Sequence, residues 1–202
     1  MLDESIGYIR LTRFSKNSHL EVEKAIKSLM GNDMKSLVLD LRDNPGGLLN
    51  SAVKILDLFI EKKELLVWTD GKARQSNKKY FSKNDPIVSN DIQIAVLING
   101  GSASASEIVA GVMQDLDRGV VIGRKSFGKG LVQTVYNIDR NKALKVTTAK
   151  YYIPSGRLIQ KSGYLPDELL ADTVALDTLF ETIGGREVKS GDGITPDYVI
   201  EP

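Results

Sequence analysis

The amino-acid sequence predicts an α/β domain in which helices pack on a largely buried β-sheet. Short apolar runs typical of buried strands alternate along the chain with longer segments whose apolar residues recur at helical spacing. Hydrophobic residues make up 42% of the 202 positions, which is enough to build the core of one domain.

The first half of the chain divides into three predicted strands and two predicted helices. Strands are expected at residues 7–11, 36–42 and 65–68, and helices at residues 18–30 and 48–60. A capping box, Ser18-x-x-Glu21, marks the start of the first helix. Leu49, Val53 and Leu56 give the second helix one apolar face, and the turn Asp43-Asn-Pro-Gly-Gly47 precedes it.

The second half of the chain continues the alternation. Strands are expected at residues 92–98, 119–123, 131–138 and 144–153, with helices from near residue 104 and over residues 167–183. The helix that starts near Ser104 places Ile108, Val112 and Leu116 on one face. The pair Gly184-Gly185 is expected to close the last helix as a C-cap.

The composition excludes several kinds of chemistry. With 27 basic and 26 acidic residues the chain is almost neutral, so we expect no nucleic-acid partner. The absence of cysteine excludes thiol catalysis, zinc–thiolate sites and disulfides. The one histidine, His19, falls in the first turn of a predicted surface helix, where we expect it to be solvated. We therefore expect no Ser–His–Asp triad, no metal and no other cofactor, and a catalytic base must be a lysine or a carboxylate.

Two glycine-rich blocks indicate a single active site. In Asn99-Gly-Gly-Ser-Ala-Ser-Ala-Ser-Glu107, a buried strand ends in small residues that lead into a helix. In Gly123-Arg-Lys-Ser-Phe-Gly-Lys-Gly130, Lys129 stands between two glycines. Taken alone, Ser104 is more typical of a structural N-cap than of a nucleophile. Together with a lysine in a tight turn, however, it completes a Ser–Lys dyad with Ser104 as nucleophile and Lys129 as base.

The residues around Lys129 are suited to a lysine that acts as a general base. A lysine acts as a base only in its neutral form, and Phe127 and Val132 could supply the apolar environment that favours this form. Gln133 falls four positions after Lys129, on the same side of an extended chain, so its amide could orient the amine.

The start of the helix after the serine run is suited to binding an oxyanion. Its free N–H groups, that of Ala105 included, could bind an oxyanion together with a glycine of the turn at residues 43–47. Further along this helix, we expect Glu107 and Asp115 to be solvated or to interact only with the helix dipole.

A nucleotide hydrolase is the competing enzymatic interpretation. Gly123-x-x-x-x-Gly128-Lys129 matches a P-loop up to its last position, and residues 37–40 could serve as the acidic strand. The next residue is Gly130 instead of the Ser or Thr that would hold magnesium. Residues 131–136 are β-branched and alternating where a P-loop must open a helix, so we favour the dyad.

Six blocks occur in order along nearly the whole chain. They are Gly7-Tyr-Ile-Arg10, Leu39-Asp-Leu-Arg-Asp-Asn-Pro-Gly-Gly47, Asn99-Gly-Gly-Ser-Ala-Ser-Ala-Ser-Glu107, Ser126-Phe-Gly-Lys-Gly-Leu-Val-Gln133, Thr148-Ala-Lys-Tyr-Tyr-Ile-Pro-Ser-Gly156 and Gly193-Ile-Thr-Pro-Asp197. Together they closely resemble the carboxyl-terminal processing (tail-specific) protease family. The resemblance implies a ClpP/crotonase-type α/β fold with Ser104 as nucleophile, Lys129 as general base and Gln133 as the residue that orients the lysine.

The same resemblance implies an oxyanion hole formed by the backbone N–H of Ala105 and of Gly46 or Gly47. Members of this family cut near the C-termini of proteins in the bacterial cell envelope or the chloroplast lumen. We therefore expect protein or peptide substrates with accessible C-terminal segments. We also expect the parent protein to be exported to the cell envelope, where it would be periplasmic or membrane-associated.

Family members usually carry a PDZ domain before the catalytic core, and nothing in the 202 residues resembles one. We therefore expect residues 1–202 to form a single catalytic domain without the PDZ domain. Activity of this core alone and its assembly into a homo-oligomer stay open. A non-catalytic binding or scaffold module is the second functional hypothesis, although such a protein would be expected to have lost Ser104, Lys129 or Gln133.

Overall fold

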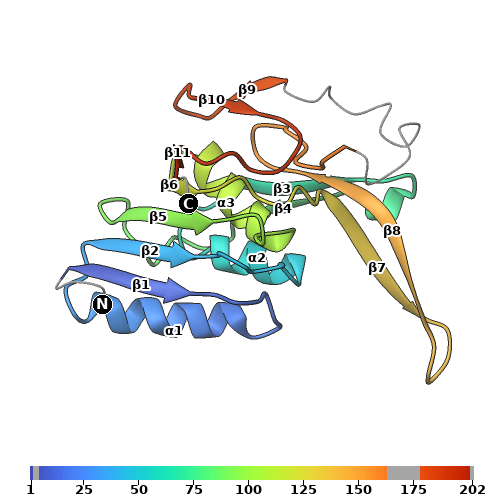
Figure 1. Cartoon of the computed structure of the whole chain (residues 1–202). Helices are drawn as coiled ribbons and strands as arrows, with labels where there is room; N and C mark the ends of the chain where they lie inside the picture. The colour runs from blue at the N-terminus through green and yellow to red at the C-terminus, as the bar shows by residue number, and fades with distance from the viewer. Residues whose placement is uncertain (2–4, 163–177, 201–202) are drawn as a thin grey trace.

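The computed structural model describes residues 1, 5–162 and 178–200. Its main sheet is parallel, with the strand order β1-β2-β5-β6-β11, and helices pack against it (Figure 1). The elements are β1 (Ile6–Arg10), α1 (Ser18–Met30), β2 (Ser36–Asp40), α2 (Leu49–Leu56), β5 (Gln93–Ile98), α3 (Ala105–Asp115), β6 (Val120–Gly123) and β11 (Tyr198–Val199). The predicted α/β class, with helices on a buried sheet, is confirmed.

A second sheet is antiparallel and has the order β4-β3-β8-β7. It comprises β3 (Leu65–Asp70), β4 (Lys78–Phe81), β7 (Leu131–Asn137) and β8 (Ala143–Tyr152), with the short 3₁₀ helix η1 (Arg74–Ser76) between β3 and β4. Strands β7 and β8 form a long hairpin that extends away from the rest of the molecule (Figure 1). Strands β9 (Leu179–Glu181) and β10 (Glu187–Lys189) form a separate hairpin.

Buried strands β2 and β5 bring two loops to the same edge of the main sheet. Leu39 and Val96 are fully buried and lie opposite each other in the parallel pair. The carboxyl ends of the two strands therefore emerge together, followed by residues 41–48 and 99–104. This edge of an open parallel sheet is where α/β proteins place their ligands.

Helix α3 is buried on all sides, so the prediction that Glu107 and Asp115 are solvated is wrong. The helix packs against α2 and against strands of both sheets, β3, β5 and β6. The second sheet thus covers the face that the main sheet leaves open. Polar side chains on a helix with no exposed face need partners inside the protein.

A buried ion pair fixes the last turn of α3. Asp115 lies 2.7 Å from the Arg157 guanidinium, with both side chains at most 1% exposed, and it accepts the Ser155 N–H at 2.9 Å. One turn earlier, Gly111 allows close packing, because a Cβ there would lie 2.6 Å from Ile153 Cδ1. The helix is therefore fixed to the segment that follows β8.

The predicted capping box at the start of α1 is not formed. The N-cap is Asn17, and the Ser18 hydroxyl, inside the helix, donates to the Ser15 carbonyl at 3.0 Å. His19 is half-buried instead of solvated, with its Nε2 3.4 Å from Lys54 Nζ.

Helix α2 ends at Leu56, four residues before the predicted end. Residues 57–60 form tight turns in which the Phe59 N–H donates to the Leu56 carbonyl at 2.9 Å. None of the helices in the described part of the chain has the length and apolar content needed to cross a membrane.

The helix predicted over residues 167–183 is wrong at its C-terminal end, and residues 167–177 lie outside the described residues. Strand β9 pairs antiparallel with β10. Gly185, at φ +80°, makes the turn between them and donates its N–H to the Thr182 carbonyl at 3.0 Å. The Gly184-Gly185 pair is therefore a hairpin turn, for which two glycines are as well suited as for a helix end.

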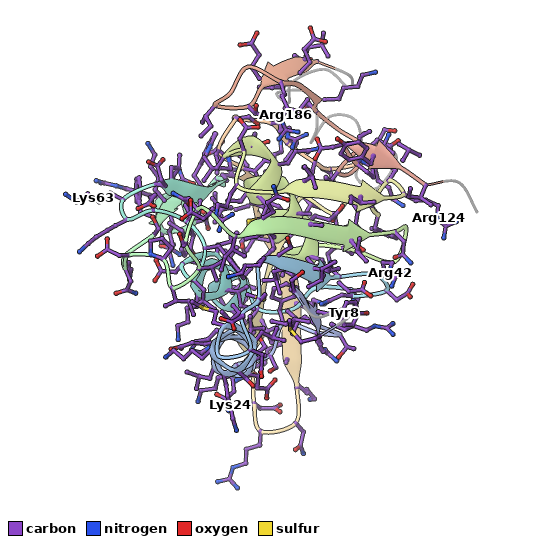
Figure 2. All side chains as sticks on the ribbon, turned by 90° about the vertical axis from the view of Figure 1, so that its left-hand side faces the viewer. Tyr8, Lys24, Arg42, Lys63, Arg124 and Arg186 are labelled. Atoms are coloured by element: carbon purple, nitrogen blue, oxygen red, sulfur yellow. The ribbon has the colours of Figure 1, made fainter. Side chains whose placement is uncertain are left out.

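Asp40, at the end of β2, is a buried carboxylate that accepts four hydrogen bonds from two residues, Tyr8 and Arg42. It accepts hydrogen bonds from the Tyr8 hydroxyl at 2.6 Å and from Arg42 Nη2 at 2.7 Å. Tyr8 and Arg42 lie on the same side of the molecule (Figure 2). Burial raises the pKa of Asp40, but the hydrogen bonds from Arg42 and Tyr8 outweigh burial and lower it from 3.8 to about 2.

We predict that Asp40 makes folding stability depend on pH in the acid range. Because its pKa is lower in the folded protein, its stabilising contribution is complete above the ordinary value and is lost as pH falls through about 2. Asp40→Asn should flatten the fall in melting temperature below about pH 4. At neutral pH it should cost about 1–3 kcal/mol, because Tyr8 and Arg42 lose an ionised acceptor.

The matched control is Asp33→Asn, at an exposed position with φ +56° that asparagine tolerates. This control should keep the wild-type pH profile. Thermal melts from pH 7 to pH 2 make the comparison, and an Asp40→Asn profile parallel to the wild type would contradict the role of Asp40.

Candidate active site

The loops that follow β2 and β5 are joined by side-chain hydrogen bonds. The Asp43 N–H donates to Asn99 Oδ1, and Asn99 Nδ2 donates to Asp43 Oδ1, both at 2.9 Å. The Ala103 N–H donates to the Asn44 carbonyl at 3.0 Å. The glycine turn and the serine run are therefore in direct contact.

Among the three serines of the run, only Ser104 does not donate its hydroxyl proton in a hydrogen bond to another described residue. The Ser102 hydroxyl donates to the Leu41 carbonyl and the Ser106 hydroxyl to the Asn44 carbonyl, both at 2.8 Å, and both side chains are fully buried. Ser104 is partly exposed, and its hydroxyl donates to none of the described residues. It is the only one of the three that can meet a substrate.

The backbone at Ser104 is strained. Its φ of +56° and ψ of −112° lie in a region that residues with a side chain rarely adopt, at a cost of about 1–3 kcal/mol. The next residue starts α3, so the hydroxyl stands at the positive end of the helix dipole. Gly46 packs against this turn, because a Cβ on it would lie 2.6 Å from the Ala103 carbonyl oxygen and 2.8 Å from the Ala105 nitrogen.

The three backbone N–H groups considered for an oxyanion hole differ in their hydrogen bonds. The Gly46 N–H donates to Asn44 Oδ1 at 2.9 Å and is therefore occupied. The N–H groups of Gly47 and Ala105 donate to no described residue. Of the Gly46-Gly47 pair, Gly47 is thus the one with a donor available for a ligand.

The buried Glu107 carboxylate joins the serine run to the lysine turn. Its Oε2 accepts the N–H of Ser104 at 2.7 Å and that of Lys129 at 2.9 Å. Its Oε1 accepts the Ser126 hydroxyl and the Gly128 N–H, both at 2.6 Å. Burial keeps the pKa of Glu107 above its usual value, although these four hydrogen bonds lower it. Because every partner is a donor, the site is built for the carboxylate form.

Sequence reasoning missed this role of Glu107. The Ser104-x-x-Glu107 spacing is that of a capping box, and Glu107 does accept the N–H of the N-cap residue. The same spacing at Ser18 predicts a capping box that the structure does not contain. The local signal was therefore present but did not reveal that the second glycine-rich block would supply the remaining donors.

Lys129 and Gln133 are both half-buried at the start of the β7 segment. Among the described residues, no hydrogen bond joins the Ser104 hydroxyl, the Lys129 amine and the Gln133 amide. The β7–β8 pairing shifts register between Val132 and Gln133, and such an irregularity re-aims the side chains beside it. The roles of Lys129 as base and Gln133 as its orienting residue stay predictions.

A match to Peptidase family S41 covers residues 5–170. The chain belongs to this family. A carboxy-terminal-processing protease of Bartonella bacilliformis is 45% identical over 170 residues, which are 82% of this chain and 39% of that protein. A carboxyl-terminal-processing protease of Synechocystis sp. is 39% identical over 167 residues, 83% of this chain and 38% of that protein.

Among solved structures, the photosystem II D1 C-terminal processing protease superposes with a TM-score of 0.73 at 30% sequence identity. The superposition covers 98% of this chain and 42% of that protein. The S41 chain thus spans about two fifths of the length of the relatives it matches.

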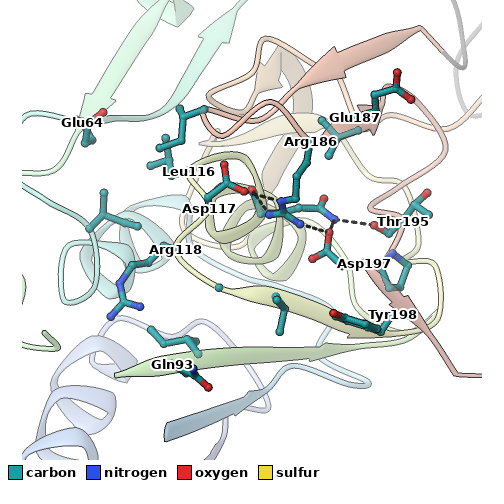
Figure 3. A pocket seen from close by; sticks show the side chains of 18 of the residues that line it. Glu64, Gln93, Leu116, Asp117, Arg118, Arg186, Glu187, Thr195, Asp197 and Tyr198 are labelled. Atoms are coloured by element: carbon teal, nitrogen blue, oxygen red, sulfur yellow. Dashed lines mark hydrogen bonds and ion pairs between the residues drawn. The ribbon is translucent and has the colours of Figure 1, made fainter. Parts of the chain in front are cut away.

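A cavity of about 1180 Å³ lies at the opposite end of the main sheet of this S41 chain (Figure 3). It is lined by Gln93 and Val120, at the amino ends of β5 and β6, and by Arg118 and Arg186. Arg186 pairs with Asp197 at 2.6 Å, and the Arg118 guanidinium donates to backbone carbonyls. Because these cations are already paired, we assign no ligand to the cavity.

We predict that Glu107→Gln destabilises this S41 chain by about 3 kcal/mol. The amide places an NH₂ group where one of the two carboxylate oxygens stood, so two of the four donors lose their acceptor. Urea unfolding of the variant measures the loss.

The matched control is Glu21→Gln, which changes an exposed carboxylate in the first turn of α1. This variant loses only an interaction with a helix dipole and should stay within about 0.5 kcal/mol of the wild type. Equal stabilities of the two variants would show that Glu107 does not hold the two segments together.

Proposed function

We propose that the chain is the catalytic core of a serine endopeptidase in which Ser104 attacks the substrate and Lys129 is the general base. The neutral amine takes the proton of the Ser104 hydroxyl while Oγ forms a bond to the carbonyl carbon of a peptide. The resulting oxyanion is bound by the N–H groups of Gly47 and Ala105. Gln133 orients the amine through its amide oxygen.

The reaction then proceeds through an acyl-enzyme. The C–N bond breaks, and the lysine ammonium returns the proton to the leaving amine. Water attacks the ester on Ser104 with the amine as base; the ester C–O bond then breaks, the ammonium returns its proton to Ser104 Oγ, and the second product leaves as a carboxylic acid. Each step returns Lys129 to the form that the next step needs.

The shared carboxylate of Glu107 is the observation that carries this proposal. The backbone nitrogens of Ser104 and Lys129 are within hydrogen-bonding distance of the same oxygen atom. A flexible lysine side chain starting this close can reach the serine hydroxyl by rotation alone. Catalytic hydrogen bonds are often long in the absence of substrate and tighten in the enzyme–substrate complex.

The relatives support a substrate class. Their names describe carboxyl-terminal processing, and one is the protease that processes the photosystem II D1 C-terminus. We propose that this chain cuts proteins with accessible C-terminal segments, near those ends. We also propose that residues 1–202 act as one catalytic domain and that the parent protein is exported to the cell envelope.

A catalytically idle scaffold of the same fold is the alternative. The strained backbone at Ser104 argues against it, because such strain is a cost that an idle fold has no reason to keep. A fluorophosphonate probe separates the two: covalent labelling at Ser104, located by mass spectrometry, supports the peptidase, whereas an unlabelled folded protein supports the scaffold.

We predict that Ser104→Ala and Lys129→Ala each reduce turnover of an unfolded protein substrate by about 10⁴-fold or more. The double variant should be scarcely worse than either single one, because a dyad acts as a unit. The rate of casein cleavage, followed by release of fluorescent peptides, measures the effect.

Lys125→Ala is the matched control for the lysine. It lies in the same turn but is exposed and pairs with Asp192 at 2.7 Å. Its turnover should stay near the wild-type value. A Lys129→Ala variant as active as Lys125→Ala would remove Lys129 from the mechanism.

We also predict that activity survives prolonged treatment with EDTA. The sequence contains no cysteine and one histidine, and within the described residues no group of three or more potential ligands gathers into a metal site. Inactivation by EDTA that added zinc reverses would disprove a metal-independent Ser–Lys mechanism.

A further inference from the structure

The hydroxyl of Tyr151, on β8, contacts both proposed catalytic residues from inside the protein. The side chain is 2% exposed. Its hydroxyl donates to the Lys129 carbonyl and lies 3.2 Å from the Ser104 carbonyl oxygen. The Tyr151 N–H also donates to the Gly130 carbonyl at 2.9 Å, so β8 holds the lysine turn through backbone and side chain together.

Tyr151 complements Glu107. The carboxylate accepts the N–H groups of Ser104 and Lys129, and the phenol contacts the C=O groups of the same two residues. Two buried side chains therefore contact both backbone polar groups of each residue, and the one phenol proton is donated to the Lys129 carbonyl. No local hydrogen bond could do this, because Ser104 and Lys129 are distant in sequence.

We infer that Tyr151 is a positioning residue, whose hydroxyl fixes the distance between the Ser104 turn and the Lys129 turn so that the serine hydroxyl and the lysine amine can meet. This inference rests on the proposed function and deepens it. Tyr151 itself touches no reacting atom.

A simple need to satisfy a buried hydroxyl does not account for this arrangement. One acceptor would be enough for that purpose, and the Ser104 carbonyl already accepts the Ile108 N–H at 3.0 Å. Burial and the negative charge of Glu107 raise the pKa of Tyr151 well above 10. The phenol therefore keeps its proton, and stays a donor, over the whole range in which a peptidase works.

Tyr152 provides a matched control in the next position of the same strand. Its ring stacks on Trp68 with the centroids 4.1 Å apart, and its hydroxyl has no hydrogen-bond partner among the described residues. Tyr151→Phe and Tyr152→Phe thus each remove one hydroxyl from β8, but only the first removes a contact with the proposed dyad.

The test compares kcat, KM and the rate of fluorophosphonate labelling at Ser104, all well below the melting temperature. Tyr151→Phe should lower kcat and the labelling rate by about 10- to 100-fold, because a displacement of about 1 Å has effects of this size. Its KM should change less than about twofold, since substrate contacts are untouched. Tyr152→Phe should match the wild type in all three.

A second variant keeps the test independent of folding defects. Tyr151→4-aminophenylalanine restores a donor at the same place and should recover most of the lost kcat. A merely structural hydroxyl predicts a lower melting temperature with kcat and labelling rate unchanged, and this result would overturn the inference. A raised KM at constant kcat would also overturn it. If Ser104→Ala and the wild type were equally active, the proposed function itself would fail instead.

Discussion

The burial of one negative charge organises the site. A carboxylate removed from water is costly unless donors replace its hydration, and Glu107 receives four of them. Two belong to Ser104 and Lys129, and two to the turn that leads to the lysine. Moving the lysine turn away would remove three of the four donors, so the need to pair this charge holds the two catalytic candidates together.

Glu107 is one of three residues that form a single face of α3. Glu107, Gly111 and Asp115 are spaced four residues apart and therefore align along the helix. The carboxylates at the two ends bind the lysine turn and the segment after β8, while the glycine between them lets Ile153 approach. The helix is fixed at both ends and tightly packed in the middle, so the strained residue that caps it, Ser104, has a rigid support.

The features that depend on local pattern could be predicted from the sequence, and those that depend on distant strands could not. A buried strand followed by small residues and a helix is a local pattern, and it placed Ser104 correctly at the head of α3. The burial of Glu107 depends on the second sheet, whose strands come from other parts of the chain. Residues 179–183 show the same limit: apolar spacing before two glycines suits a helix end or a hairpin, and only the pairing with β10 decides.

The residues that contact the Ser104 turn and Glu107 come later in the chain, and this order matters during biosynthesis. Synthesis proceeds from the N-terminus, so a ribosome-bound chain that has completed only α3 contains Ser104 but neither Lys129 nor Tyr151. Such an intermediate has the proposed nucleophile without the proposed base, and it has the Glu107 carboxylate without three of its four donors. The order of synthesis therefore delays assembly of the candidate site until the strands of the second sheet have formed.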